Sequence, residues 1–288
     1  MTLRLDISFE FFPPAAGPAE AGFWAALDRL APLEPGFISL TYGAGGTARE
    51  RNDRILRALL ARGRALPAGH LTCVGASRAE TDAVAREWAA AGLRRVVALR
   101  GDMPGLKAPY APHPEGYRDA AELVAGLRRI SDFDISVAAY PECHPDSADL
   151  VSDLDNLKRK FDAGADRALT QYFFDAETFL RFRDRARRAG IAAPLVPGIL
   201  PITDYGKISA FSARCGTSVP AWLAARFEGL DSDPETRALV AATTASELCQ
   251  RLIAEGITAF HFYTLNKAPL SLAVCRMLGL RPTLQEAA

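Results

Sequence analysis

The sequence lacks several features that mark particular classes of protein. Its 34 basic and 34 acidic residues give a formal net charge of zero, which leaves no broad basic field for nucleic acid or an anionic membrane surface. The five cysteines are scattered and never spaced as CxxC, which argues against a disulfide framework or a zinc site. The sequence shows no secretory signal, and no apolar run approaches the roughly 20 residues of a membrane span. These absences predict a cytoplasmic protein that binds small molecules rather than nucleic acid or membrane.

Ligand-binding motifs of several enzyme classes are also missing. No GxGxxG follows an expected strand and no GxxxxGK[ST] occurs, which argues against a Rossmann dinucleotide domain and a P-loop. The four histidines form no HxH or HxxxH pair, so we expect no metal. Because the net charge is zero, an anionic ligand must be held by a local cluster of basic residues.

The sequence alternates short β-rich runs with amphipathic segments of helical length, a pattern typical of repeated βα units around a parallel sheet. Strands are expected over residues 7–11, 37–42, 68–73, 95–99, 134–139, 167–171, 194–197 and 259–263. Helices are expected over residues 20–30, 48–62, 79–91, 117–130, 147–163 and 176–189, and two or three more over residues 207–255. We therefore predict one (βα)₈ TIM-barrel domain over residues 1–288, with extra helices before the last strand.

Polar residues gather where the expected strands end. Active sites of such barrels lie at the C-terminal ends of the strands, so polar residues there are more informative than elsewhere. One such residue alone is as readily a satisfied polar group of the barrel core, but their number favours a site. They are Glu10, Thr41, Tyr42, His70, Arg100, Gly101, Asp102, Tyr140, His144, Gln171, Tyr263 and Thr264.

Glu10 stands in the segment SFEFFPP, among three phenylalanines and two prolines. Poorly hydrated surroundings disfavour the carboxylate, so we expect the pKa of Glu10 to be raised. A carboxyl group that stays partly protonated near neutral pH can act as a general acid. The alternative is a glutamate that pairs with an arginine inside the barrel.

The expected helix over residues 147–163 carries a polar stripe beside its apolar seam. The stripe consists of Asp149, Asp153, Asn156 and Lys160, spaced three and four residues apart. If this stripe faces a groove, Asp153 and Asn156 could bind ribose hydroxyls and Lys160 a phosphate. His144, near the helix start, would add a donor, whereas Arg159 points away from the stripe on a helical wheel. The alternative is a solvated face with ion pairs within the helix.

Nine segments of the chain, taken in order, resemble the methylenetetrahydrofolate reductase family. They are SFEFFPP from Ser8, TYGA from Thr41, HLTC from His70, ALRGD from Ala98, AAYPECHP from Ala138, LKRKFDAGAD from Leu157, TQYFFD from Thr170, PGILPI from Pro197 and HFYTLNK from His261. The resemblance implies a barrel that holds FAD without a Rossmann fold. It also implies a ping-pong reaction, in which NADH or NADPH reduces the flavin and the hydride then converts 5,10-methylenetetrahydrofolate to 5-methyltetrahydrofolate. A homo-oligomer is a further expectation from the family.

The resemblance also implies roles for individual residues. Glu10 resembles the general acid that helps open the five-membered ring of the folate, and Asp102 resembles an acidic residue near the flavin and the pterin. Substrate-contact positions of the family are matched by Gln171, Lys207, Phe211, Tyr263 and Lys267. FAD-contact positions are matched by Thr41, Tyr42, Ala44, His70, Arg100, Gly101, Asp102, Tyr117, Arg118, Tyr140, His144, Asp153, Asn156, Arg159 and Lys160.

Two other functions are weighed against this one. Another FAD-dependent barrel, such as a proline dehydrogenase-like oxidase, would share the fold and the cofactor but not the ordered segments. A non-catalytic flavin- or folate-binding subunit would not need an acid at the position of Glu10.

Overall fold

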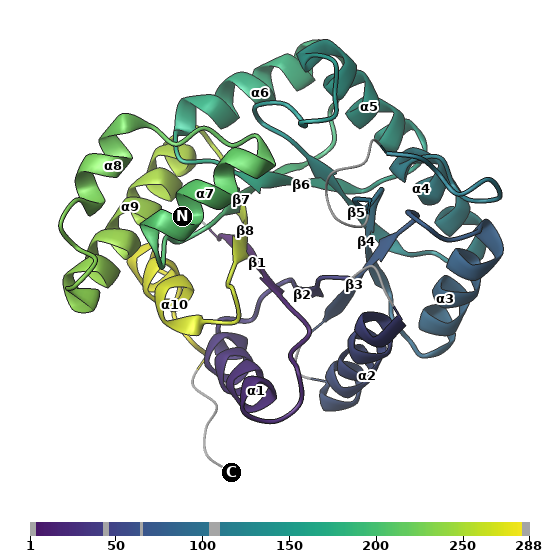
Figure 1. Ribbon diagram of the computed structural model, residues 1–288, viewed down its shortest axis with the longest axis horizontal. Helices are drawn as coiled ribbons and strands as arrows, with labels where there is room; N and C mark the ends of the chain where they lie inside the picture. The colour runs from purple at the N-terminus through teal and green to yellow at the C-terminus, as the bar shows by residue number, and fades with distance from the viewer. Residues whose placement is uncertain (1–3, 43–45, 64–65, 104–109, 284–288) are drawn as a thin grey trace.

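The computed structural model describes residues 4–42, 46–63, 66–103 and 110–283, and its centre is a closed barrel of eight parallel strands (Figure 1). Each strand pairs with the next one along the chain, and the eighth closes the barrel against the first. The predicted (βα)₈ barrel is therefore confirmed. The strands are β1 (Asp6–Phe11), β2 (Phe37–Leu40), β3 (Pro67–Thr72), β4 (Arg95–Leu99), β5 (Asp134–Ala139), β6 (Arg167–Tyr172), β7 (Leu195–Ile199) and β8 (Ala259–Tyr263).

An outer ring of helices surrounds the barrel (Figure 1). Three of them stand between β7 and β8, which confirms the predicted extra helices before the last strand. In the described part of the chain, no helix combines the length and the apolar composition needed to cross a membrane. The helices are α1 (Pro18–Leu30), a 3₁₀ turn (Ala31–Leu33), α2 (Gly46–Arg62), α3 (Arg78–Ala90), α4 (Ala120–Ile130), α5 (Leu150–Asp162), α6 (Ala176–Arg188), α7 (Tyr205–Cys215), α8 (Ala221–Phe227), α9 (Pro234–Ala254) and α10 (Ala268–Met277).

Two helices begin three residues later than the sequence pattern predicts. The side chain of Asp119 accepts a hydrogen bond from the backbone N–H of Glu122 and so caps α4. Asp149 caps α5 in the same way through the N–H of Ser152. A carboxylate at this position satisfies a backbone donor that the helix itself cannot pair, so the helix starts directly after it. The three residues before each cap belong to the loops around the site.

The alternation of β1 decides which way Glu10 points. Successive side chains of a strand lie on opposite faces, and Phe9 and Phe11 are fully buried in the core between barrel and helices. Phe11, for example, packs edge-on against Phe23 of α1. Ser8 and Glu10 therefore face the barrel interior, where each lies beside a residue of β8.

The barrel interior is filled below the strand ends. Phe37, Ala68, Val97, Leu169 and Val196 come from five strands and pack against one another as a separate apolar cluster. Layers of this kind turn the centre of such a barrel into packed core rather than a pore. Val97 and Leu169 also line the cavity above, so this cluster is the floor on which the site is built.

Candidate active site

Two adjoining cavities open at the C-terminal ends of the strands. The Glu10 chamber has a volume of about 360 Å³ and contains Glu10 among its walls. The Lys160 chamber has a volume of about 350 Å³ and lies between the ends of β4 and β5 and the helices α4 and α5. The two chambers meet along β4 and β5, because both are lined by Leu99, Asp102, Ala138 and Tyr140.

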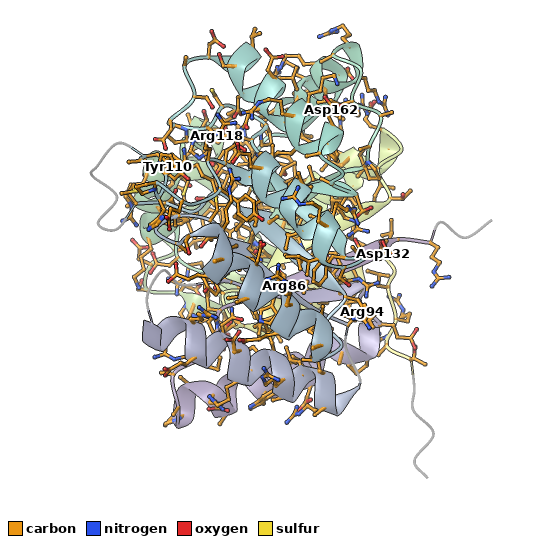
Figure 2. All side chains as sticks on the ribbon, turned by 90° about the vertical axis from the view of Figure 1, so that its right-hand side faces the viewer. Arg86, Arg94, Tyr110, Arg118, Asp132 and Asp162 are labelled. Carbon is orange, nitrogen blue, oxygen red and sulfur yellow. The ribbon has the colours of Figure 1, made fainter. Side chains whose placement is uncertain are left out.

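Figure 2 shows which end of the barrel this is. Tyr110 and Arg118, which line the Lys160 chamber, lie at one end of the molecule in that view. Arg94 and Asp132, which precede β4 and β5, lie at the opposite end. The chambers therefore occupy the end at which (βα)₈ barrels carry their active sites.

A carboxylate and two imidazoles meet in the Glu10 chamber. Oε2 of Glu10 lies 3.4 Å from Nε2 of His70 on β3 and 3.6 Å from Nε2 of His261 on β8. Both distances exceed those of ordinary hydrogen bonds, and neither Nε2 atom has a hydrogen-bond partner among the described residues. Ser8 completes the group, with Oγ 2.7 Å from Nδ1 of His261. The cluster therefore places two imidazole nitrogens within 3.6 Å of one carboxylate oxygen.

The prediction that the pKa of Glu10 is raised is wrong. Burial raises this pKa, but the facing imidazoles of His261 and His70 outweigh burial and lower it below its ordinary value. The prediction fails because the buried carboxyl group faces His70 on β3 and His261 on β8, which the segment around Glu10 does not reveal. Burial also lowers the pKa of His70, which favours its neutral form.

The other walls of the Glu10 chamber are aromatic or polar. Tyr263 donates a hydrogen bond from its hydroxyl to the backbone oxygen of Thr170, 2.8 Å away, which fixes its ring. Phe211 on α7 is 44% exposed and lies nearly parallel to Tyr172, with ring centroids 6.3 Å apart. Flat aromatic walls with polar groups at their edges suit a planar heteroaromatic ligand. Of the predicted residues, this chamber brings together Glu10, Thr41, Tyr42, His70, Asp102, Tyr140, Gln171, Phe211 and Tyr263.

The Lys160 chamber is rich in cations. Three of its four Lys and Arg side chains are paired with carboxylates. Arg100 lies 2.6 Å from Asp146 and 3.6 Å from Asp102. Arg159 lies 2.7 Å from Asp119, and Arg118 pairs with Glu122. Lys160 differs from these arginines, because it has no ion-pair partner among the described residues and is only 8% exposed. Its Nζ donates a hydrogen bond to the backbone oxygen of Ala138 at 2.8 Å. Burial lowers the pKa of Lys160 to about 8.

The polar stripe on α5 divides between two tasks. Asn156 and Lys160 line the Lys160 chamber, as does Arg159, which the helical wheel places off the stripe. Asp153 instead holds the loop before α5, because its carboxylate accepts hydrogen bonds from the backbone N–H of His144 at 3.3 Å and from Oγ of Ser147 at 2.9 Å. Of the predicted residues, this chamber brings together Arg100, Gly101, Asp102, Arg118, Tyr140, His144, Asn156, Arg159 and Lys160.

Several predicted residues lie outside both chambers. Tyr117 is buried between α3 and α4, where its hydroxyl donates to Asp82 at 2.7 Å. Lys207 is 85% exposed and pairs with Asp204 at 3.1 Å. Lys267 borders a different cavity, between α1 and α10. Ala44 lies outside the described residues.

Sequence reasoning missed Ser8, His261 and Tyr172 as parts of the site. A signal for His261 was present, because the segment AFHFY places it on the opposite strand face from two phenylalanines. Phe260 and Phe262 are fully buried toward the helices, so His261 must face the interior. No such signal in the sequence identifies Ser8 as the residue that contacts His261.

The chain is similar to known proteins over nearly its whole length. The family described as "Methylenetetrahydrofolate reductase" matches residues 2–279. The chain is 47% identical over 281 residues to the 5,10-methylenetetrahydrofolate reductases of Salmonella typhimurium and Escherichia coli, and each match covers 98% of this chain and 93% of the relative. It is 36% identical over 284 residues to "Methylenetetrahydrofolate reductase (NADH) 1" of Arabidopsis thaliana, where the match covers 95% of this chain and 48% of the relative.

A solved structure shares the fold. It is a protein from Clostridium thermocellum described as uncharacterized and as binding two copies of 5-methyl-5,6,7,8-tetrahydrofolic acid. The two chains superpose with a TM-score of 0.65, and the match covers 95% of this chain and 94% of the other. At 12% sequence identity, the likeness extends to the fold alone.

Proposed function

We propose that this chain, which belongs to the methylenetetrahydrofolate reductase family of oxidoreductases, reduces 5,10-methylenetetrahydrofolate to 5-methyltetrahydrofolate. The electron donor in this proposal is NADH or NADPH, and the hydride passes through bound FAD. The observation that carries the proposal is the pair of adjoining chambers. One is cationic, and the other holds a carboxylate between two imidazoles beneath aromatic walls. A cytoplasmic location, expected from the composition of the sequence, and a homo-oligomeric state, expected from the resemblance, remain predictions.

The residues of the Lys160 chamber fit the anionic part of FAD. A buried ammonium group without a carboxylate at ion-pair distance is costly unless an anion reaches it, and Lys160 is such a group among the described residues, although Asp153 and Asp119 lie near enough to raise its pKa. Arg100, Arg118 and Arg159 would add charge at the rim of the same cavity. Bound there, FAD would supply the chemistry that the side chains lack, taking a hydride from the nicotinamide and giving it to the folate in two separate half-reactions.

The Glu10 cluster would supply the proton that the folate needs. Opening the five-membered ring requires protonation of a ring nitrogen, and a general acid within hydrogen-bond reach performs this step. Glu10 is the acid in this proposal, and the imidazoles of His70 and His261 lie within 3.6 Å of its Oε2. Because these imidazoles lower the pKa of Glu10, only a small fraction of Glu10 carries the proton in the free protein at neutral pH. The hydroxyl of Ser8 fixes the ring of His261 through Nδ1.

Asp102 would act at the junction of the two chambers, since it lines both. Its carboxylate is 67% exposed and lies 3.6 Å from Nη2 of Arg100. A negative charge near a flavin disfavours the reduced, more anionic state and stabilises a developing cation on the substrate.

We expect Asp102→Asn to raise the reduction potential of the bound flavin, because the variant removes this negative charge. Nicotinamide oxidation should then be retained or become faster, while folate reduction slows. The measurement is a spectroscopic redox titration of the flavin, with single-turnover rates for each half-reaction. A lower potential, or equal slowing of both half-reactions, would contradict the role given to Asp102.

The proposed function is tested by an anaerobic absorbance experiment on the purified protein. NADH or NADPH should bleach the flavin spectrum, and 5,10-methylenetetrahydrofolate should then restore it. If proline-type substrates bleach the oxidised flavin and folate does not restore it, the alternative barrel oxidoreductase is supported. A flavin that binds but is never reduced supports the non-catalytic subunit.

A further inference from the structure

Two hydrogen bonds join Tyr172, at the end of a barrel strand, to the helix that carries Phe211 and to the residue just beyond its end. The hydroxyl of Tyr172, at the end of β6, lies 3.0 Å from Oγ of Ser212 on α7. Thr217, just beyond the C-terminus of α7, donates from Oγ1 to the backbone oxygen of Tyr172 at 3.2 Å. Ser212 and Tyr172 are 0% and 3% exposed, so the first hydrogen bond is shielded from water.

These ties matter because α7 does not belong to the main barrel core. Its buried Ile208 belongs to a second apolar cluster that packs over the top of β6 and β7 together with α8 and α9. That cluster consists of Tyr172, Phe174, Leu200, Ile202, Ile208, Leu223, Phe227 and Ala241. Tyr172 is thus both a member of this cluster and the polar link between α7 and a barrel strand.

The link acts directly on a substrate wall, since Phe211 precedes Ser212 in the chain. The rings of Phe211 and Tyr172 lie 20° from parallel with centroids 6.3 Å apart, and both line the Glu10 chamber. Burial raises the pKa of Tyr172 to about 12, so its hydroxyl stays protonated across the working pH range. A shift of α7 by an ångström would move Phe211 relative to the aromatic wall that it faces.

We propose that the Tyr172–Ser212 hydrogen bond is a positioning device, which holds α7 against the end of β6 and so fixes the place of Phe211 in the wall that planar substrates contact. The inference rests on the proposed function, because it assigns the two residues to the binding of those substrates. Neither residue reacts; both act through the placement of Phe211.

The chemistry of the pair gives a specific expectation for variants. Tyr172→Phe keeps the aromatic ring but leaves the hydroxyl of Ser212 buried without its partner, whereas Ser212→Ala leaves the hydroxyl of Tyr172 with Cys215 as its remaining neighbour. An unpaired buried hydroxyl costs more than the loss of both partners, so the double variant should be no worse than the stronger single variant. A control is available in Ser246 of α9, which is 1% exposed and whose Oγ has no hydrogen-bond partner in the described chain.

The first test needs no substrate. Amide hydrogen exchange over residues 205–215 should become about fivefold faster in the FAD-loaded Tyr172→Phe and Ser212→Ala variants, as expected for loss of one buried hydrogen bond. Ser246→Ala should leave exchange in this segment unchanged. Unchanged exchange in both single variants would overturn the inference, whatever the enzyme reduces.

The second test separates positioning from general damage. We expect the KM of each substrate to rise about three- to tenfold in the single variants, with kcat and flavin content close to wild type. A fall in kcat or flavin content with unchanged KM would mean that the pair serves stability only, and would overturn the positioning role. If the wild-type protein reduces no folate, the proposed function fails, while the exchange experiment still decides whether the pair holds α7.

Discussion

Glu10→Gln is expected to slow folate reduction by about 10²- to 10⁴-fold, the range for removal of a general acid. The variant keeps the size and burial of the side chain but cannot deliver the proton to the folate. Flavin binding and nicotinamide oxidation should stay close to wild type, because neither requires that proton and Glu10 lies outside the Lys160 chamber. Single-turnover rates of flavin reduction and reoxidation, measured separately, check the prediction.

The same variant decides the origin of the pH dependence. Because the pKa of Glu10 is lowered in the free protein, the protonated fraction of Glu10 is already small at neutral pH and falls further as the pH rises. Folate reduction should therefore decline with rising pH in the wild type, and this dependence should be absent from Glu10→Gln. If both half-reactions slowed equally, or if neither slowed, Glu10 would not be the acid.

His261 offers an independent check of the cluster. His261→Asn removes the imidazole 3.6 Å from Oε2 of Glu10, so the pKa of Glu10 should move upward, toward the value that burial alone favours. The decline in folate reduction should then begin at higher pH. An unchanged pH profile would mean that the imidazole does not act on the carboxylate.

The fold could be predicted from the sequence because the local strand and helix patterns and their order along the chain indicate the same architecture. Alternating strand and helix patterns specify βα units, and eight such units close a barrel. Because the strands are parallel, residues at the C-terminal ends of different strands lie at the same end of the barrel. This is why Glu10, His70, Asp102 and Gln171, which are far apart in the chain, were predicted to lie in one site and do line one chamber.

What could not be predicted depends on how strands meet. The pairing of β1 with β8 puts Ser8 beside His261 and Glu10 beside Tyr263. This register follows from closure of the whole barrel, and no local pattern in either segment encodes it. The pKa of Glu10 was therefore judged from its neighbours in the chain, whereas its neighbours in space determine it.

The helix α5 shows the same limit within one element. Helical spacing correctly grouped Asn156 and Lys160 toward one cavity, but it could not show that Asp153 is engaged by the loop before the helix. Nor could it show that Arg159 reaches the cavity. A long side chain can approach a groove from the edge of a helix face, so the wheel angle of its Cα is a poor guide.

Lys160→Met should weaken FAD binding about hundredfold, or about 2.7 kcal/mol, as expected for loss of a buried hydrogen bond to a charged group. The variant keeps a long apolar chain, so the fold should persist. The matched control is Lys158→Met on the same helix, because Lys158 is 44% exposed and pairs with Asp162 at 2.7 Å outside the chamber. Lys158→Met should leave FAD affinity unchanged. Titration of the apoprotein with FAD checks both variants.

The pKa of Lys160 predicts how FAD affinity changes with pH. With a pKa of about 8, the ammonium group loses its proton above that pH in the apoprotein, so wild-type FAD affinity should fall as the pH rises past 8. The affinity of Lys160→Met should not follow this change. Because burial disfavours the charged lysine below pH 8, the apoprotein of the variant should unfold with no smaller free energy than wild type at pH 7. A variant that loses stability but keeps FAD affinity would show that Lys160 supports the fold rather than the ligand.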